Sequence, residues 1–294
     1  MSTDFHGLPA RSLSNDYLHL AYLEGAGPRI VHLSLAGIGG NVMAELPDLS
    51  IETPAGPYRL YGGHRLWHAP EIMPRTYVQD DAGCTAVDTP GGAIISGPVE
   101  AGTGIRKQIA LQLAHDRAAV TVTHRLENLG PWGVELAPWA ITQLRLGGVA
   151  ILPQTRHALD GAGLLPNRNL VLWPYARLAD PRLSLHDDLW LLRADADSQA
   201  IKVGYMNRVG WAAYLTGRVL FVKRFGTQPD LPHVDFGCNC ESYCRDRFIE
   251  LETIGPLVRL QPGQSVTHVE EWELIEIGDP PETLEGIRQL VSTL

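Results

Sequence analysis

The stretch IRKQIALQLAHDRAAVTVTHRLE, residues 105–127, decides the fold class. From Ile105 to Leu113, apolar residues and Lys107 occupy every second position, with mostly polar residues between them. The same period-two alternation runs through residues 119–127, and His115 and Asp116 lie between the two runs. Two alternating runs that are joined by a short polar turn predict an antiparallel β-hairpin.

Comparable patterns recur along the chain. Further strands are expected at residues 17–23, 30–35, 134–146, 189–193, 201–205, 211–215, 219–225, 248–253 and 265–275. One helix is expected at the C-terminal end, capped by Asp279, with apolar residues at helical spacing from Leu284 to Leu294. The 30 Gly and 21 Pro are spread over the whole length, which is typical of many turns between short strands. We therefore expect an all-β protein, a large sandwich of antiparallel sheets with a short C-terminal helix, in which residues 1–294 form one domain.

Composition and charge exclude several classes of partner. Duplex nucleic acid requires a dense basic surface, whereas this chain has a formal net charge of −9. The sequence has no apolar run of the ~18 residues that a membrane span needs, and residues 1–13 lack the apolar segment of a signal peptide. We expect a cytoplasmic protein that binds neither nucleic acid nor membrane. Four cysteines in 294 residues do not make a disulfide framework.

The densest polar cluster is GGHRLWHAPE, residues 62–71, which we interpret as a loop bounded by Gly and Pro. Loops carry functional residues more often than strands do. Trp67 can stack on the apolar face of a sugar ring. Arg65 and Glu71 can bind hydroxyl groups as charged donor and acceptor, with Arg75 nearby. The alternative is an internal loop that is stabilised by salt bridges.

His64 and His68 in the same cluster have two interpretations. Both can be structural hydrogen-bond donors, or they can form a metal site with Glu71 as an oxygen ligand. Their spacing of four places two ligands together on a helix. Because Gly63 precedes and Pro70 follows, we do not expect a helix, and we expect no metal at this position.

Glu250 and Glu252 form the second constellation, within the expected strand 248–253. They project from one strand face, roughly 6–7 Å apart along the chain, while Ile249 and Leu251 point to the core. Repulsion between two carboxylates raises the pKa of one of them, which suits a general acid or base. The alternative is a solvated face with two harmless charges.

Isolated polar and aromatic residues provide further candidates. Trp139 follows Pro138, and a proline inside a strand indicates an edge or a bulge; Trp139 is either a sugar platform or a core residue. Lys223, in an otherwise apolar strand, needs a counter-charge or a ligand oxygen. Asn167 and Arg168 could bind an anionic group through the guanidinium.

The segment CNCESYC, residues 238–244, holds three of the four cysteines. Structural zinc sites prefer cysteine pairs two to four residues apart in two separate knuckles, whereas these spacings are one and three without a second knuckle. We expect reduced, partly buried thiols, with Glu241 and Tyr243 as candidates to line a cleft. No nucleotide-binding signature is present. We therefore expect no cofactor.

Together, these segments resemble the galactose mutarotase-like superfamily, in particular a bacterial branch of it. The resemblance implies a large β-supersandwich with a concave carbohydrate site. The matching pieces are GPRI at 27–30, GGHRLWHAPE at 62–71, ELAPWA at 135–140, PNR at 166–168 and ELETIGPL at 250–257.

The epimerases of that superfamily interconvert sugar anomers with a Glu base and a His acid. By position in the strand order, Glu250 or Glu252 is similar to the base. The stretch that carries the acid in those enzymes holds Trp139 and no His here, so His64 or His68 would have to supply the proton.

Three functions remain open at this point. The first is an aldose 1-epimerase-like enzyme, the second a non-catalytic sugar-binding or sensing protein, and the third a carbohydrate lyase or hydrolase. All three predict a small carbohydrate as the partner and allow a homodimer. All three also require the segments around residues 66 and 251 to meet across one hollow.

Overall fold

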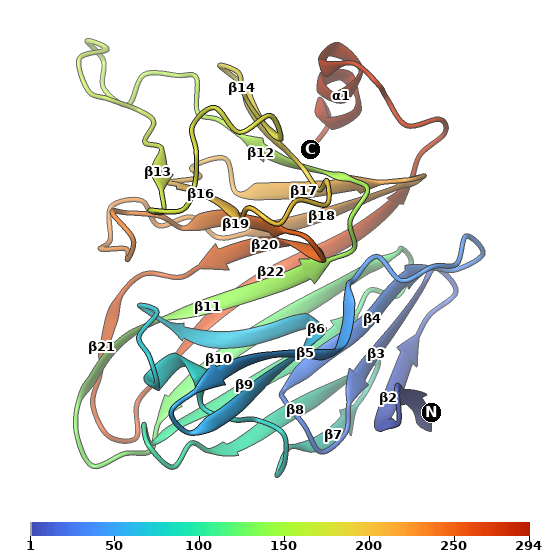
Figure 1. Cartoon of the computed structure of the whole chain (residues 1–294), viewed down its shortest axis with the longest axis vertical. Helices are drawn as coiled ribbons and strands as arrows, with labels where there is room; N and C mark the ends of the chain where they lie inside the picture. Colours follow the sequence, from blue (N-terminus) through green and yellow to red (C-terminus); the bar gives the residue numbers. More distant parts are fainter. Residues whose placement is uncertain (1) are drawn as a thin grey trace.

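The structure is a computed structural model that describes residues 2–294, and two antiparallel sheets dominate it (Figure 1). The larger sheet has twelve strands in the order β1 (Ser2–Phe5), β2 (Leu8–Ser14), β3 (Leu18–Leu23), β4 (Arg29–Leu35), β6 (Gly56–Ala69), β11 (Val134–Leu144), β20 (Phe248–Ile254), β19 (Cys240–Arg245), β16 (Ile201–Tyr205) and β13 (Val171–Leu172), with β5 (Glu45–Thr53) on β6 and β21 (Val258–Leu260) on β11. The second sheet has ten strands in the order β14 (Leu183–Leu185), β15 (Leu189–Arg193), β12 (Val149–Pro153), β17 (Trp211–Thr216), β18 (Val219–Phe225), β22 (Ser265–Glu276), β10 (Ala119–Asn128), β9 (Ile105–Leu113), β8 (Gly92–Val99) and β7 (Thr85–Thr89). The expected all-β architecture is confirmed.

The hairpin expected from residues 105–127 is the β9–β10 pair. Its register places Leu113 opposite Val120, with the His115–Asp116 segment in the turn. In β9 the buried and less buried positions alternate as the sequence predicts. Lys107 lies on the buried side because its ammonium forms an ion pair of 2.9 Å with Glu100.

The main hydrophobic core lies between the sheets. Strands of both sheets contribute to it, among them Ile249 and Leu251 of β20 and Phe221 of β18. Because successive side chains of a strand point to opposite faces, Glu250 and Glu252 project from the other face of the larger sheet. This outer face is where polar side chains collect.

Two glycines explain why residues 62–71 were wrongly interpreted as a loop. Residues 62–69 are the second half of β6, the longest strand. A Cβ on Gly62 would lie 2.0 Å from the Ala44 carbonyl oxygen, and one on Gly63 would lie 2.0 Å from that of Ile30. These glycines therefore permit a close backbone approach inside a strand.

Pro138 also departs from the expectation, because it lies in β11, a central strand, and not at an edge. β11 pairs with β21 through Leu136 and with β20 from Trp139 onward. Pro138 stands between these two ladders, where no backbone N–H is required.

The C-terminal helix α1 (Leu284–Val291) covers the outer face of the smaller sheet (Figure 1). Its Ile287 and Val291 pack in one cluster with Leu191 and Val222. The expected cap, Asp279, is wrong: the Thr283 hydroxyl accepts the Gly286 N–H at 3.1 Å. In the described part of the chain, no helix has the length and apolar character that crossing a bilayer demands.

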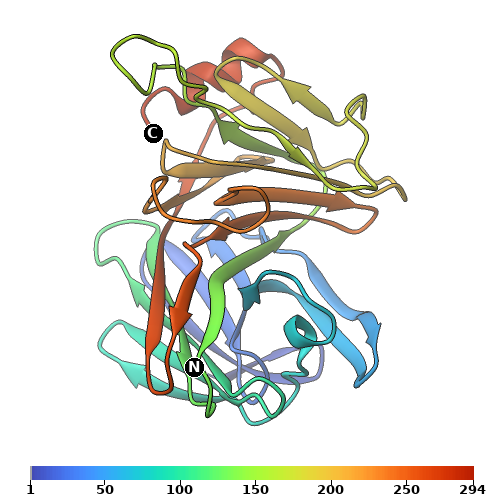
Figure 2. The same cartoon turned by 90° about the vertical axis from the view of Figure 1, so that its left-hand side faces the viewer.

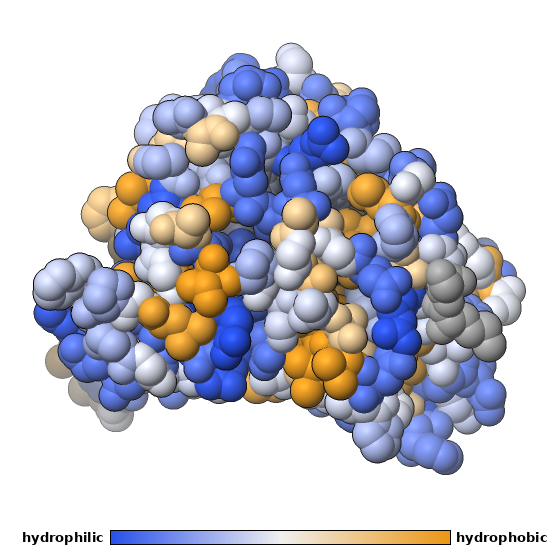
Figure 3. Space-filling model, turned by 90° about the horizontal axis from the view of Figure 1, so that it is seen from below, coloured by the Kyte–Doolittle hydropathy of each residue, from blue (hydrophilic) through white to orange (hydrophobic). Residues whose placement is uncertain are grey.

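The outer surface is mixed in polarity. Seen from below, it is mostly hydrophilic, and apolar side chains form small separate groups (Figure 3). Scattered apolar groups of this kind are ordinary on soluble proteins.

Candidate functional site

A cleft of about 500 Å³ lies on the outer face of the larger sheet. This volume is in the range of roughly 300–1,000 Å³ that is typical of small-molecule sites. Five neighbouring strands, β6, β11, β20, β19 and β16, form its floor. In Figure 2 the short 3₁₀ helix η1 (Arg75–Tyr77), which contacts β6, lies below β19 and β20. The polar and aromatic residues that line the cleft include Arg65, Trp67, Glu71, Tyr77, Trp139, Gln143, Lys202, Tyr243 and Glu250.

Strand register brings these residues to one face. Trp67 of β6 lies opposite Trp139 of β11, and Gln143 lies opposite Glu250 of β20, which in turn lies opposite Tyr243 of β19. Side chains opposite one another in antiparallel strands are neighbours on the same face. The segments around residues 66 and 251 therefore meet in one hollow, as the sequence analysis required.

Glu250 is the carboxylate of β20 that lines the cleft. Its Oε1 accepts hydrogen bonds from Arg65 Nη2 at 2.9 Å and from Gln143 Nε2 at 3.0 Å. Neither bond uses Oε2. Burial raises the pKa of Glu250, Arg65 opposes this effect, and the charge of Glu252 adds to it. Glu250 is thus a held carboxylate with a raised proton affinity and one oxygen that no described hydrogen bond engages.

Two tryptophans form the aromatic wall, and both are fixed in orientation. The Trp67 indole N–H donates to the Tyr58 hydroxyl at 2.8 Å, and that of Trp139 donates to Glu252 Oε2 at 2.7 Å. Their ring centroids are 5.4 Å apart in an edge-to-face arrangement. Arg65 lies over the Trp67 ring at 4.3 Å.

Lys202 of β16 is a site residue that the sequence analysis missed. Its ammonium lies 2.7 Å from Glu241 Oε2 and 3.0 Å from Glu252 Oε2. It also lies 4.8 Å from the Trp139 ring centroid and 4.6 Å from that of Trp173. Burial opposes the charge, but Glu241 and Glu252 raise the pKa of Lys202 well above its ordinary value. The signal was available, because Lys202 is the one charged residue in the expected strand 201–205.

Glu241 and Glu252 lie behind this ammonium and are fully buried. Desolvation raises the pKa of Glu241 to about 8, although Lys202 opposes the shift. Glu250 and Glu252 do share a face, as expected, but only Glu250 is among the residues that line the cleft. The carboxylate pair is therefore one surface group and one supporting group.

Glu71 and Tyr77 close one side of the cleft. The Tyr77 hydroxyl donates to Glu71 Oε1. Arg75, expected beside Glu71, instead donates to the Ala69 carbonyl oxygen at 3.3 Å and is not among the lining residues.

No family model matches this chain, and no curated protein matches it either. Solved structures do match. A galactose mutarotase-like protein from Lactobacillus casei is 11% identical with a TM-score of 0.58, over 90% of this chain and 100% of that one. An aldose 1-epimerase candidate from Escherichia coli K12 is 14% identical with a TM-score of 0.54, over 91% and 99%. A TPR-domain protein from Parabacteroides distasonis is 13% identical with a TM-score of 0.62, over 94% of this chain, which spans only 50% of that protein.

The fold is galactose mutarotase-like. At these identities the likeness shows the fold alone. The supersandwich implied by the resemblance is confirmed, and the chemistry of this chain depends on its own residues.

His64 and His68 lie outside the cleft. Strand alternation turns them to the opposite face from Arg65 and Trp67. His64 Nδ1 contacts Thr142 Oγ1 at 2.9 Å, and His68 Nε2 contacts Glu100 at 3.0 Å. Both are almost wholly buried. The geometry therefore does not pair either histidine with Glu250 as acid and base.

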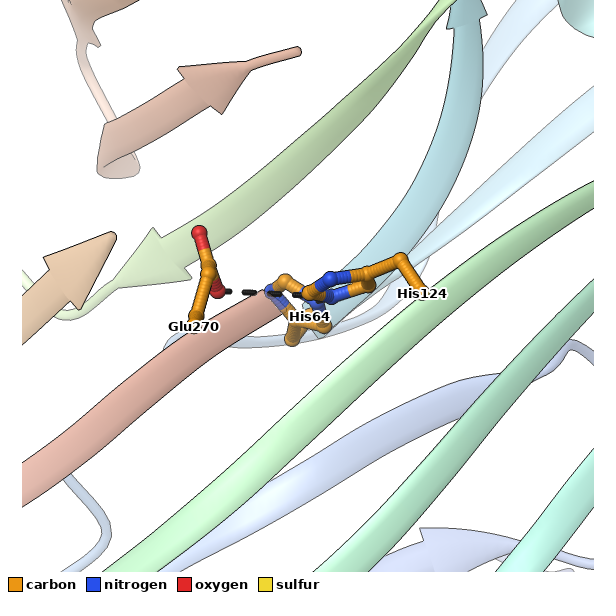
Figure 4. A group of neighbouring side chains, drawn as sticks. All are labelled: His64, His124 and Glu270. Atoms are coloured by element: carbon orange, nitrogen blue, oxygen red, sulfur yellow. Dashed lines mark hydrogen bonds and ion pairs between the residues drawn. The ribbon is translucent and has the colours of Figure 1, made fainter. Parts of the chain in front are cut away.

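His64 belongs to a buried polar network between the sheets (Figure 4). The rings of His64 and His124 and the carboxylate of Glu270 point toward one another, and one ligand atom of each lies within 4.8 Å of the others. In the described part of the chain, no other group of His, Cys, Asp or Glu meets this test. His64 Nε2 and His124 Nε2 are 2.7 Å apart, a hydrogen bond.

The network fits hydrogen bonding better than a metal. Glu270 Oε1 is 2.8 Å from the Lys223 ammonium, and Oε2 accepts the Trp272 indole N–H at 2.7 Å. An ammonium in place already compensates this carboxylate. The metal set considered from sequence is not assembled either, since His64 and His68 face the core and Glu71 faces the cleft.

The remaining predicted ligand residues lie elsewhere. Lys223 forms an ion pair with Glu270 in the interior. Asn167 donates to the His157 carbonyl oxygen at 2.9 Å, and Arg168 donates to that of Asp187 at 2.9 Å. None of the three is among the residues that line the cleft. The four cysteines are free and buried.

Proposed function

We propose that the chain binds a sugar in this cleft and that Glu250 accepts the proton of the anomeric hydroxyl, as the base of an aldose 1-epimerase-like reaction. One observation carries the proposal. Glu250 is held through Oε1 by Arg65 and Gln143, no described hydrogen bond engages its Oε2, and two tryptophans line the same cleft. A fixed carboxylate next to aromatic rings suits a ring with hydroxyl groups on its edge and C–H groups on its face.

Unsatisfied polar atoms around Glu250 support a polar ligand. Arg65 Nε and Nη1 and Gln143 Oε1 are buried and lack a hydrogen-bond partner in the described chain. Buried polar groups without partners are rare in folded proteins and call for an explanation. Hydroxyl groups both donate and accept, so a sugar can satisfy the two arginine donors and the amide acceptor together.

The reaction needs a proton at each end of the bond that breaks. Glu250 takes the proton of the anomeric hydroxyl, the bond from C1 to the ring oxygen breaks, and the ring oxygen takes up a proton. The open aldehyde then rotates and closes on its other face by the reverse steps. The raised pKa of Glu250 brings its proton affinity closer to that of a working base at neutral pH.

A non-catalytic sugar-binding role is the second candidate. The lack of a suitable general acid among the described residues of the cleft favours it. Within the described chain, the cleft is lined by no histidine. The protonated groups that do line it include Lys202 and Tyr77, and the pKa of each is raised away from neutrality. Groups that hold their protons so firmly are poor general acids. A hydrolase finds less support. It uses two carboxylates, and one of the two expected here, Glu252, is buried behind Lys202.

The test combines binding with anomer exchange. A panel of monosaccharides is screened by thermal shift, since a ligand of the folded state raises stability by mass action. Anomer exchange is then followed by NMR for the sugars that bind. We expect Glu250→Gln to slow exchange by roughly 10²–10⁴-fold, the usual contribution of a general base. Glu135→Gln, at an exposed position of β11 outside the cleft, should leave the rate unchanged.

The outcomes separate the candidates. An unchanged rate in Glu250→Gln removes Glu250 as the base. Binding without any acceleration by the native chain leaves the non-catalytic role. Failure of every sugar to bind refutes a carbohydrate site in this cleft.

A further inference from the structure

The cleft continues into a second hollow of about 310 Å³. The two hollows share Glu71, Tyr77, Trp139 and Lys202, so they are adjacent compartments of one cleft. Glu250 lines only the first compartment, and Trp173 and Asp235 line only the second. A single sugar ring at Glu250 therefore leaves the second compartment without an occupant.

We propose that the cleft binds a reducing glycan of at least two units, with the reducing-end unit at Glu250 and the next unit against Trp173. This inference rests on the proposed sugar-binding function. Only the reducing-end unit carries a free anomeric hydroxyl, the group that Glu250 is proposed to contact. The second unit must then be attached through another oxygen of the first and lie toward Trp173.

The larger sheet determines where Trp173 lies. Trp173 directly follows β13, whose Leu172 pairs with Val203 of β16. A Cβ on Gly204 would lie 3.2 Å from the Trp173 ring and 2.8 Å from Cys238 Sγ, so the glycine allows the indole to lie close to the strand. Lys202 contacts the Trp173 and Trp139 rings at similar distances and thereby links the aromatic groups of the two compartments.

Asp235 supplies a carboxylate to the second compartment from a strained turn. Asp235 and Phe236 have φ of +50° and +55°, and Gly237 follows at +89°. Non-glycine residues in this left-handed region are uncommon and cluster at ligand sites. The turn is held by hydrogen bonds from the Gly237 and Cys238 N–H groups to the Val234 carbonyl oxygen.

The chemistry of the second compartment fits a sugar better than an apolar substituent. Two indoles line it, those of Trp173 and of the shared Trp139. Glu71, Asp235 and Lys202 add two acceptors and one donor group around it. An apolar substituent would bury the Asp235 carboxylate without giving it a hydrogen bond, which is unfavourable.

Calorimetric titration tests the inference with matched sugars. The probes are glucose, galactose and mannose, and the disaccharides maltose, cellobiose, β-1,4-galactobiose and β-1,4-mannobiose. We expect at least one disaccharide to bind tenfold or more tighter than the monosaccharide at its reducing end, about 1.4 kcal/mol. The 4-O-benzyl derivative of that monosaccharide should bind less tightly than the disaccharide.

Variants assign the gain to the second compartment. Trp173→Ala should reduce the ratio of monosaccharide to disaccharide Kd by at least fivefold, and Asp235→Asn serves as a second variant if Trp173→Ala fails to fold. Trp132→Ala removes a tryptophan that is 80% exposed and outside both compartments, and it should leave the ratio unchanged.

Three results would overturn the inference. If monosaccharides bind but no disaccharide binds tighter than the monosaccharide at its reducing end, the second subsite is refuted while the sugar-binding function stands. Tighter binding of the benzyl derivative than of the disaccharide shows an apolar subsite instead. If no sugar of either size binds, the proposed function itself fails, and the inference fails with it.

Discussion

Glu241 holds its carboxyl group inside the larger sheet, and this burial should appear as a pH dependence. Its pKa is about 8 in the folded chain, against an ordinary value of 4.5. Between these pH values the folded state keeps a proton that the unfolded chain releases. Stability from this group is therefore lost as pH rises from about 4.5 to about 8.

Glu241→Gln removes this loss. The free energy of unfolding of the variant, relative to the native chain, should rise by up to roughly 1.4 kcal/mol per pH unit across the window. Urea denaturation at several pH values measures the difference. Glu135→Gln, at an exposed position, should give a flat difference. A flat difference for Glu241→Gln would mean that this carboxyl group is already ionised in the fold.

Single residues show what the sequence could and could not tell. Period-two alternation correctly placed Glu250 and Glu252 on one face. It could not tell which of them reaches the cleft, because Trp139 and Lys202, from two other strands, engage Glu252. The assignment of His64 failed for another reason: alternation separates it from Arg65 at once, but only if the segment is taken as a strand.

At the scale of elements, Lys223 joins strands of the two sheets. From β18 its ammonium reaches Glu270 on β22 at 2.8 Å, and it donates to Thr142 Oγ1 on β11 and to the Leu251 carbonyl oxygen on β20, both at 3.1 Å. Lys223→Met leaves the Glu270 carboxylate buried without its ammonium. We expect a loss of about 3–5 kcal/mol in the free energy of unfolding.

A double-mutant cycle measures the coupling. Lys223→Met with Glu270→Gln should cost less than the two single changes added together, by more than ~1 kcal/mol, because no lone charge is left. The exposed pair Arg218–Glu276, at 3.1 Å near the ends of the same two strands, is the control and should contribute less than ~1 kcal/mol. Additive single changes at Lys223 and Glu270 would show that the two groups act independently.

Whole elements were predicted best where a strand is a short, almost continuously buried run of mostly apolar residues. Strands 189–193, 201–205 and 219–225 match the structure residue for residue. β6 was missed because Gly62 and Gly63 interrupt its pattern. Glycine is needed at these positions because the backbone of β4 and of residue 44, which lie far away in the sequence, approaches them closely. The helix was found but its cap was not, because Asp279 and Thr283 are both competent caps by residue type.

The whole molecule should lose stability on mild acidification because it buries neutral histidines. Desolvation lowers the pKa of His64, His124 and His268 below the ordinary 6.5, to about 3 for His268. The unfolded chain binds protons at these groups near pH 6.5 and the folded chain does not. Their contribution to stability is therefore present above pH 6.5 and is lost as pH falls toward the folded values.

Between pH 6.5 and 4.5 the three histidines outweigh the carboxyl groups that act the other way. Each histidine contributes up to roughly 1.4 kcal/mol per pH unit, and the opposing groups include Glu241 and, in part, Glu250 and Asp235. The net effect is a loss of roughly 1–3 kcal/mol per pH unit in the free energy of unfolding as pH falls. Below pH 4.5 Glu270, whose pKa is lowered to about 2 because Lys223 overcomes the effect of burial, adds to the loss.

Urea denaturation from pH 7.5 to 4 measures how the free energy of unfolding changes with pH. His268→Gln should reduce this pH slope by the contribution of about one bound proton. His115→Gln, on the exposed turn between β9 and β10, should leave the slope unchanged. A native chain equally stable at pH 6.5 and 4.5 would mean that these histidines are already charged in the fold, and the polar network between the sheets would then need a different pattern of protons.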